Sequence, residues 1–344
     1  MSERVLSQRE LNRALLARQL LLERGRISVP KALERIGGIQ AQYAPAMYVG
    51  VWSRIEDLER AALTRALERR SVIQGTLMRA TIHLVSRADY WPLTAAIRAE
   101  RRAWWERTHK QADPKRARAA GKRLRAFLSG APRRWKEIQE RFGRDDALAA
   151  AQYVDLVRVP PSGTWEQRRA DLYGLAEEWI GPDDADPDQG VELLVRRYLG
   201  GFGPASPAEA ADFGMISIAR VRAALGRMQL RRFRDENGRE LVDLPRAPLP
   251  HPDTPAPPRF LPVWDATLLV HARRTQILPE EHRAKVFNVK TPNSVNTFLV
   301  DGQVAGTWRY DRDRIRIEAF GRIRRTARRE LDEEAERLAA FHRR

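Results

Sequence analysis

The chain contains no cysteine. That absence excludes disulfides, thiolate metal sites and cysteine nucleophiles. Its six histidines are scattered without the spacing of zinc ligands, so neither a structural nor a catalytic zinc is expected. No glycine-rich phosphate loop follows a predicted strand, and no single lysine stands out from the arginine-dominated basic residues. The sequence therefore predicts no metal, no cofactor and no Schiff-base lysine.

Long apolar runs are missing as well. No run approaches the roughly 18 residues of a membrane span, and Met1–Gln8 lacks the apolar core of a secretory signal. We therefore expect a cytoplasmic protein without a membrane partner. Its 344 residues are enough for two or three domains at roughly 100–200 residues each.

Positive charge is in large excess, with 62 Lys and Arg against 45 Asp and Glu and a formal net charge of +17. The isoelectric point of about 10.9 favours polyanionic partners such as nucleic acid. A high-GC genome would also raise the arginine content, and this alternative accounts for part of the excess. The distribution is uneven, however, because residues 98–141 hold fifteen basic and five acidic side chains, whereas residues 177–192 are acidic. This uneven distribution of charge indicates that one face of the protein contacts the phosphate groups of a nucleic acid.

The N-terminal residues predict four helices. Ser7–Glu10 has the capping-box pattern that opens a first helix. A second helix begins near Ser28 and ends at the Gly37-Gly38 pair. Apolar spacing predicts further helices over residues 47–52 and 56–69.

A β-hairpin is predicted directly after these helices. Residues 72–74 and 77–85 are rich in β-branched side chains and flank a glycine-containing turn at Gly75-Thr76. Helices followed by a hairpin are the winged-helix order. Weaker versions of the pattern recur downstream, which predicts a tandem array. Their helices cover residues 115–128, 133–142, 206–213 and 217–226, and their strands cover residues 156–159, 228–233 and 240–244.

The last third of the chain has a different composition. Eight prolines fall within residues 245–262, which predicts an extended linker or surface strap. Beyond it, short antiparallel strands are predicted, and Asp301-Gly302 is a strong hairpin signal. These strands cover residues 287–289, 297–300, 303–308 and 315–317, and a charged helix follows over residues 327–342.

Several motifs in this order carry a resemblance to a known family. They are Gln40-Ala41-Gln42, Leu77–Leu84, Pro161–Trp165, Gly203–Ala205 and Phe298–Gly302. Together they resemble the winged-helix DNA glycosylase superfamily typified by AlkZ and YcaQ, over nearly the whole chain. Members of this superfamily excise N7-alkylated purines, including those in interstrand crosslinks. The azinomycin-resistance branch carries Gln-x-Gln, whereas the broader YcaQ branch ends the motif in aspartate, so Gln42 places this chain nearer the antibiotic-resistance side.

The resemblance implies an α+β fold that is mostly helical, with tandem winged-helix modules in a C-shaped arrangement and a C-terminal antiparallel β-domain. It also implies a monofunctional glycosylase that acts as a monomer on double-stranded DNA near the nucleoid, without an obligate protein partner. The expected parts are a first winged-helix module at 1–98, a second at 99–180, a third at 181–244, the proline-rich linker at 245–262, and the β-domain with its terminal helix at 263–344.

Gln40 and Gln42 are the candidate catalytic residues. An N7-alkylated purine is positively charged and leaves readily, so the enzyme needs neither a strong acid nor a strong base. Two oriented amides can hold water near C1′ and favour an oxocarbenium-like transition state. The alternative is that either glutamine caps a helix end or makes a buried hydrogen bond.

Arg54, Arg79, His83 and Arg309 are the candidate phosphate or lesion contacts, because each lies in or beside a recognisable module. His83 alternates with apolar neighbours, so the alternative is that it is a structural histidine within a β-strand.

In related enzymes a hairpin of the C-terminal domain enters the groove near the lesion. The Lys290–Ser294 turn, with Lys290 and Asn293 as DNA contacts, and the Asp301-Gly302 hairpin are both candidates for that element, and plain sheet connectivity is the alternative. Trp104-Trp105 would either stack on bases or pack into a core.

A transcriptional regulator built on winged helices is the competing class, because a fold does not determine a function. A regulator reads a defined sequence with polar side chains on a recognition helix. Residues 47–52 are mostly apolar and would make a poor recognition surface. The native lesion, and the choice between crosslink and monoadduct, stay open at this stage.

Overall fold

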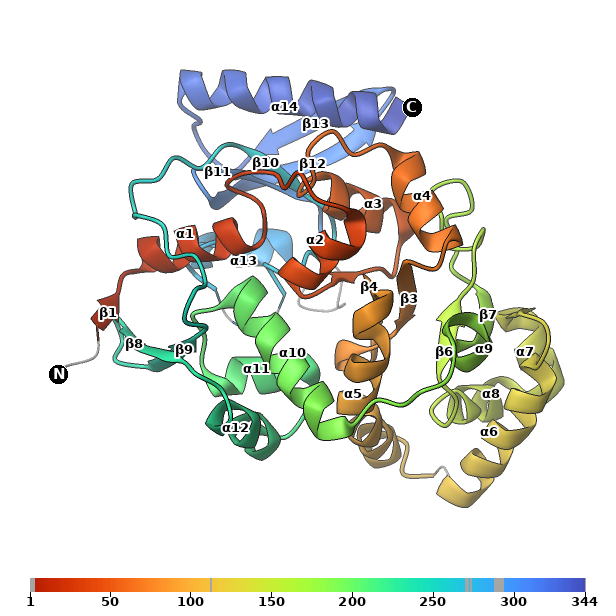
Figure 1. The fold of residues 1–344 in the computed structure, drawn as a ribbon. Helices are drawn as coiled ribbons and strands as arrows, with labels where there is room; N and C mark the ends of the chain where they lie inside the picture. The colour runs from red at the N-terminus through yellow and green to blue at the C-terminus, as the bar shows by residue number, and fades with distance from the viewer. Residues whose placement is uncertain (1–3, 112, 270–271, 273, 288–293, 344) are drawn as a thin grey trace.

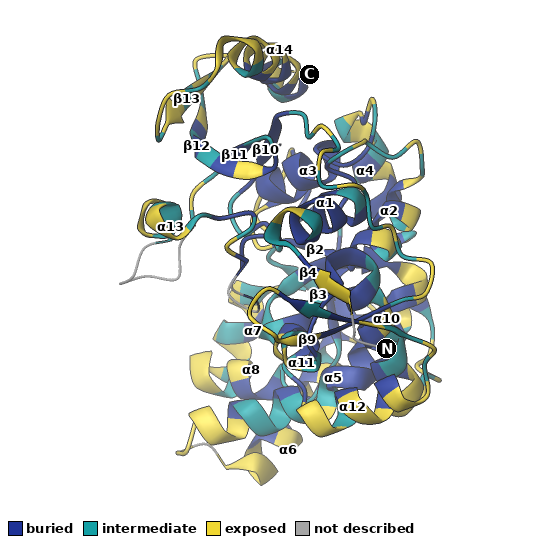
Figure 2. Cartoon of the chain, turned by 90° about the vertical axis from the view of Figure 1, so that its left-hand side faces the viewer, coloured by how far each residue is buried: buried dark blue, intermediate teal, exposed yellow. Residues whose placement is uncertain are grey.

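The computed structural model describes residues 4–111, 113–269, 272, 274–287 and 294–343. It has the predicted α+β composition. In both views α14 lies at one end of the molecule, α6 and α8 lie at the other end, and α1 to α4 lie between them (Figures 1 and 2). The winged-helix and C-shape assignments stay predictions. None of the described helices combines the length and the apolar character needed to cross a bilayer.

The predicted N-terminal helices are confirmed. Ser7 and Glu10 form both hydrogen bonds of the capping box, and the second helix ends at Gly37 in the left-handed region, with φ 81°. The third helix is buried along its whole length. Their bounds are α1 (Gln8–Arg18), α2 (Val29–Ile36), α3 (Ala44–Trp52) and α4 (Arg60–Glu68).

A six-stranded antiparallel sheet joins the first predicted hairpin to the second. The strand order is β2-β4-β3-β6-β7-β5, and β3 pairs with β6 at the junction. The two predicted wings are therefore one continuous sheet. The strands are β2 (Ile39–Gln40), β3 (Val72–Thr76), β4 (Ile82–Ser86), β5 (Arg133–Arg134), β6 (Leu156–Arg158) and β7 (Leu172–Leu175).

The predicted turn at Gly75-Thr76 is wrong. β3 runs through Thr76, and the chain reverses at Leu77–Thr81, where Arg79 and Ala80 have φ of 54° and 53°. Gly75 pairs with His83 inside the sheet, and a Cβ there would lie 2.6 Å from the Tyr90 ring. The glycine therefore serves a close packing contact and not a turn.

Helices cover the sheet and form the far end of the molecule. The predicted helix over 133–142 begins with the short strand β5 and becomes helical at Trp135. Residue 98, where the first module was expected to end, lies inside the long helix α5. The helices are α5 (Arg87–Thr108), α6 (Pro114–Leu128), α7 (Trp135–Phe142), α8 (Arg144–Ala150) and α9 (Ala176–Ile180).

Residues 181–244 form three helices and most of a small sheet with the order β1-β8-β9. Its edge strand β1 was not predicted, and it pairs in parallel with β8. The buried ion pair of Arg18 with Asp243, at 2.6 Å, holds this sheet to α1. The elements are β1 (Arg4–Leu6), α10 (Pro187–Phe202), α11 (Pro207–Gly214), α12 (Ile218–Gly226), β8 (Arg231–Asp235) and β9 (Glu240–Asp243).

The C-terminal part is the predicted antiparallel sheet, with the order β10-β11-β12-β13. The predicted linker at 245–262 is too long, because residues 259–261 form the first strand of this sheet. The predicted strand at 287–289 lies mostly outside the described residues. The elements are β10 (Arg259–Leu261), α13 (Glu280–Val286), β11 (Thr297–Val300), β12 (Gln303–Asp311), β13 (Arg314–Ala319) and α14 (Arg325–Arg343).

One hydrophobic cluster spans the N-terminal helices and the C-terminal sheet. It includes Tyr48 and Trp52 of α3, Phe260 and Trp308 of the sheet, and Phe341 of α14. Burial of this apolar surface is the main force that holds the two parts together. The outward faces of α14, α6 and α8 are exposed (Figure 2).

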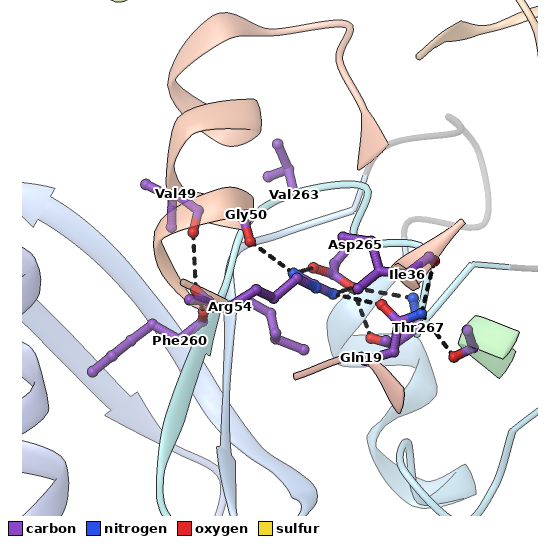
Figure 3. A network of polar contacts seen from close by, with 12 residues as sticks. Gln19, Ile36, Val49, Gly50, Arg54, Phe260, Val263, Asp265 and Thr267 are labelled. Carbon is purple, nitrogen blue, oxygen red and sulfur yellow. Dashed lines mark hydrogen bonds and ion pairs between the residues drawn. The ribbon is translucent and has the colours of Figure 1, made fainter. Parts of the chain in front are cut away.

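A buried ion pair joins the same two parts. The Arg54 guanidinium donates to both carboxylate oxygens of Asp265, at 2.9 and 3.0 Å, to the Gly50 carbonyl at 2.9 Å and to Gln19 Oε1 at 3.1 Å (Figure 3). Arg54 is 1% exposed. The predicted DNA contact by Arg54 is therefore corrected, because its guanidinium is enclosed and both of its Nη atoms are hydrogen-bonded to protein groups.

We predict that Arg54→Ala lowers the free energy of unfolding by about 3–5 kcal/mol, because it leaves the Asp265 carboxylate buried without its partner. Urea unfolding followed by circular dichroism measures the change. Arg26→Ala is the matched control, since Arg26 pairs with Glu56 on the surface and its removal should barely shift the midpoint. Equal shifts in the two variants would contradict the role assigned to Arg54.

Candidate functional site

The backbone of Gln40-Ala41-Gln42 is held from both sides. β2 pairs with β4 so that Gln40 lies opposite His83. The Ala41 N–H donates to the Ile82 carbonyl at 2.8 Å, and Gln74 of β3 donates through Nε2 to the Ala41 carbonyl at 2.9 Å. These bonds fix the segment at the edge of the six-stranded sheet, between the stop of α2 and the start of α3.

The two glutamine amides contact each other. Gln40 is 8% exposed and donates through Nε2 to Oε1 of Gln42, which is exposed. Gln40 Oε1 accepts from Arg79 Nη2 at 3.4 Å. Because a guanidinium only donates, Arg79 sets the orientation of the Gln40 amide, with its oxygen toward Arg79 and its nitrogen toward Gln42. The pair is therefore an ordered unit with one buried and one exposed member.

Arg79 lies in the tight turn between β3 and β4. Its Nη1 donates to the Phe213 carbonyl of α11 at 3.1 Å, and its guanidinium lies 5.2 Å from the centre of the Phe213 ring. Burial lowers the pKa of Arg79 to about 10, so the side chain is still charged at neutral pH. Arg79 lies behind the glutamine pair, which favours a positioning role over the predicted contact with phosphate.

His83 is buried beneath Gln40 and is 2% exposed. Burial and the nearby Arg79 charge lower its pKa to about 3, so the imidazole is neutral. Nδ1 donates to the Thr81 carbonyl at 3.1 Å, which leaves Nε2 to accept from Arg79 at 3.5 Å. The predicted DNA contact by His83 is therefore corrected, since the ring is enclosed and supports Arg79.

The remaining predicted contacts lie in the C-terminal part. Arg309 of β12 is exposed and lines a groove of about 640 Å³ together with Arg316 and Lys285. Its contact with DNA stays a prediction. Lys290 and Asn293 lie outside the described residues.

The Asp301-Gly302 hairpin does not project toward a groove. The Asp301 carboxylate binds Arg9 at 2.8 Å and Arg13 at 2.5 Å, and the Gly302 carbonyl accepts from Asn12 at 2.8 Å. All three partners belong to α1, so this hairpin is docked on the first helix. The prediction that this hairpin enters the DNA groove is therefore corrected.

The tryptophan pair serves packing. Trp105 is 4% exposed and stacks on His109 at a centroid distance of 5.0 Å, and Trp104 packs against the same small cluster. Of the two alternatives left open by the sequence, the structure favours core packing over base stacking.

A hollow of about 470 Å³ opens beside Gln42. The side chains that form it were not predicted from the sequence, because they come from four separate segments of the chain. Pro161–Trp165, which the sequence did single out, precedes one of these segments directly. The main lining side chains are Tyr43, Trp135, Arg168, Arg169, Asp171 and Tyr173.

Among the described residues, no three His, Asp or Glu side chains converge in a way that could hold a metal ion. The site therefore offers amides, the guanidinium of the half-buried Arg79 and a neutral imidazole. Groups of this kind position water and stabilise charge, and they do not supply a strong acid or base.

We predict that His83 makes folding stability depend on pH. Its folded pKa of about 3 lies below the ordinary 6.5, so the unfolded chain binds the extra proton. The stabilisation is complete above pH 6.5 and is lost as the pH falls toward 3, by about 2 kcal/mol between pH 7 and pH 5.

Urea unfolding of the wild type and of His83→Gln at both pH values measures this dependence. His342, whose pKa burial lowers to about 4, is present in both proteins, so the difference between their pH dependences isolates His83. The same pH dependence in the two proteins would show that His83 is not held neutral.

Comparison with known proteins places the chain in a family and finds a similar fold. The family model described as DNA glycosylase AlkZ-like matches residues 33–341. No curated protein sequence matches the chain. Among solved structures, the DNA glycosylase AlkZ of Streptomyces sahachiroi is similar in fold, with a TM-score of 0.80 and 20% identity over 98% of this chain and 97% of that one. The chain belongs to the AlkZ-like DNA glycosylase family.

Proposed function

We propose that the chain hydrolyses the N-glycosidic bond of N7-alkylated purines in double-stranded DNA, with bulky adducts or interstrand crosslinks as substrates. The observation that carries the proposal is the hydrogen-bonded pair of Gln40 and Gln42, held at a sheet edge with one amide exposed. Family membership supports DNA as the substrate.

The amides suit the chemistry of a cationic leaving group. Alkylation at N7 places a positive charge on the purine, so the base departs without being protonated by the enzyme. Positive charge then develops at C1′ and the ring oxygen of the sugar. The partial negative charge of an amide oxygen stabilises that charge, and the same oxygen accepts a hydrogen bond from the attacking water.

Arg79 orients the amides for this task. By holding Gln40 Oε1, it directs Gln40 Nε2 to Gln42 and so fixes the position of the exposed amide. Neutral His83 accepts from Arg79 without adding a second positive charge behind the site. The arrangement is preorganised, because little reorientation is needed when DNA binds.

Water is the nucleophile in this proposal, which makes the enzyme monofunctional. No lysine is among the described residues that hydrogen-bond to the glutamine pair or line the adjoining hollow. Among the described residues, Asp171 is the carboxylate that lines that hollow, and it is bound by Arg134 at 2.9 Å and by Arg169 at 3.5 Å. Because these ion pairs engage the carboxylate, Asp171 is not proposed as a general base.

The exposure of Gln42 supports large or tethered lesions. A base tied to the opposite strand is not easily swung into a deep pocket, as ordinary base-flipping enzymes require. Here the second amide lies at the surface beside an open hollow, where a lesion need not be fully enclosed. Self-resistance to a DNA-alkylating natural product is the biological role that such a substrate range would serve.

A winged-helix regulator is the second candidate. All nine residues of α3 are buried, so this helix cannot present side chains to a DNA groove. That burial favours the glycosylase over a sequence-reading protein that uses α3 for recognition.

We predict that Gln40→Ala and Gln42→Ala each lower the single-turnover rate of base release by roughly 100-fold, because each removes one oriented amide. The measurement is release of free base, and of abasic sites, from a duplex that contains N7-methylguanine. The exposed Gln189 at the start of α10 supplies the matched control, and Gln189→Ala should retain the wild-type rate.

Full single-turnover activity in both variants, with DNA binding intact, would contradict the proposed mechanism. Sequence-specific binding by the wild type without any base release would instead favour the regulator.

We also predict that Arg79→Met lowers the rate of base release by at least roughly 10-fold while DNA affinity is unchanged, because Arg79 acts through Gln40. Affinity is measured over a range of salt concentrations, since loss of a phosphate contact would reduce the salt slope by about 1. A reduced slope with an unchanged rate would show that Arg79 contacts the DNA backbone and does not position the amide.

A further inference from the structure

The hollow beside Gln42 has no part in the bond-breaking step described above. We call it the aromatic hollow and define it by Gln42, Tyr43, Trp135, Arg168, Asp171 and Tyr173, with Ile82, Arg169 and Ala170 completing its lining. Its volume of about 470 Å³ lies within the range of roughly 300–1,000 Å³ that small-molecule sites occupy. The exposed glutamine forms part of its wall, so any group bound there lies next to the reacting base.

Three aromatic side chains line the hollow, and two of them contact each other. Trp135 begins α7 and Tyr173 lies on β7, and their ring centres are 5.1 Å apart with the planes tilted by 43°. The Arg158 guanidinium lies 4.6 Å from the centre of the Tyr173 ring and donates to its hydroxyl at 3.3 Å, which holds that ring in place. The third, Tyr43, directly follows the glutamine motif and is 42% exposed.

The charges around the hollow distinguish its possible occupants. Arg168 and Arg169 are exposed and favour DNA phosphates at the rim. Asp171 lies within the lining, and its carboxylate is paired with Arg134 and Arg169, so it presents no free charge to a ligand. The interior therefore suits a planar, uncharged ring system.

We propose that the aromatic hollow binds a planar aromatic group carried by the alkyl adduct, and that it thereby gives lesions with fused rings an advantage over small alkyl lesions. The inference rests on the proposed function, because the adduct must belong to a base that the glutamine pair releases. Trp135 is then a specificity residue that touches the substrate, separate from the amides that act on the bond. Stacking on an aromatic side chain supplies the binding energy.

The test compares two duplexes of the same sequence. One carries N7-methylguanine, and the other carries guanine with a fused-ring arylmethyl group at N7. Equilibrium affinity and single-turnover base release are measured for the wild type, Trp135→Ala, Trp135→Phe and Trp104→Ala. Trp104 is the matched control because it is a half-buried tryptophan on α5 that does not line the hollow.

Trp135→Ala should weaken binding and release of the fused-ring lesion by roughly 10-fold or more, as loss of one stacking partner does. Release of N7-methylguanine should stay within about twofold of wild type, because a methyl group does not reach the rings. Trp135→Phe should restore most of the loss, and Trp104→Ala should leave both lesions unchanged.

Equal losses on both duplexes would overturn the proposal, because the hollow would then hold something common to both, such as an unstacked normal base. No loss on either duplex would overturn it as well.

If the wild type releases neither lesion, the proposed function fails and the affinities alone decide the inference. Tighter binding of the fused-ring duplex that Trp135→Ala abolishes would still support the hollow as a site for aromatic groups. Equal affinity of the wild type for both duplexes would overturn it.

Discussion

The pairing of β2 with β4 is the constraint on which the rest of the site depends. In this register Gln40 lies opposite His83, while Ala41 is held between the Ile82 carbonyl and the Gln74 amide. A shift by one residue would turn Gln40 to the opposite face of the sheet and separate it from Arg79. A two-residue strand has few hydrogen bonds of its own, so Gln74 and the stop of α2 at Gly37 are needed to keep it in place.

Arg79 connects this strand edge to distant parts of the chain. Its guanidinium donates a hydrogen bond to Gln40 and another to the Phe213 carbonyl of α11. The same side chain therefore links the glutamine pair to α11. Arg54 and Asp265 make a similar connection between α3 and the C-terminal part. These charges are largely enclosed, so their geometry is set by the fold and barely screened by salt.

The sequence was most informative where structure is local. The capping box at Ser7, the helix stop at Gly37 and the placement of the glutamine motif after the second helix depend on neighbours within a few residues, and the structure has all three. Contacts between distant segments were not predictable in this way. Arg54 and its partner Asp265 are 211 residues apart, and Asp301 and its partner Arg9 on α1 are 292 residues apart. For the same reason, that Trp135 and Tyr173 line a hollow beside Gln42 could not be predicted from the sequence.

In the proposed mechanism Gln40 and Gln42 act as one unit, and a double-mutant cycle on the rate of base release tests this directly. Single-turnover rates are compared for the wild type, Gln40→Ala, Gln42→Ala and the double variant on one N7-alkylated duplex. We expect strong non-additivity, with the double variant about as slow as the slower single variant. Losses that multiply independently would contradict it, because each amide would then act without the other.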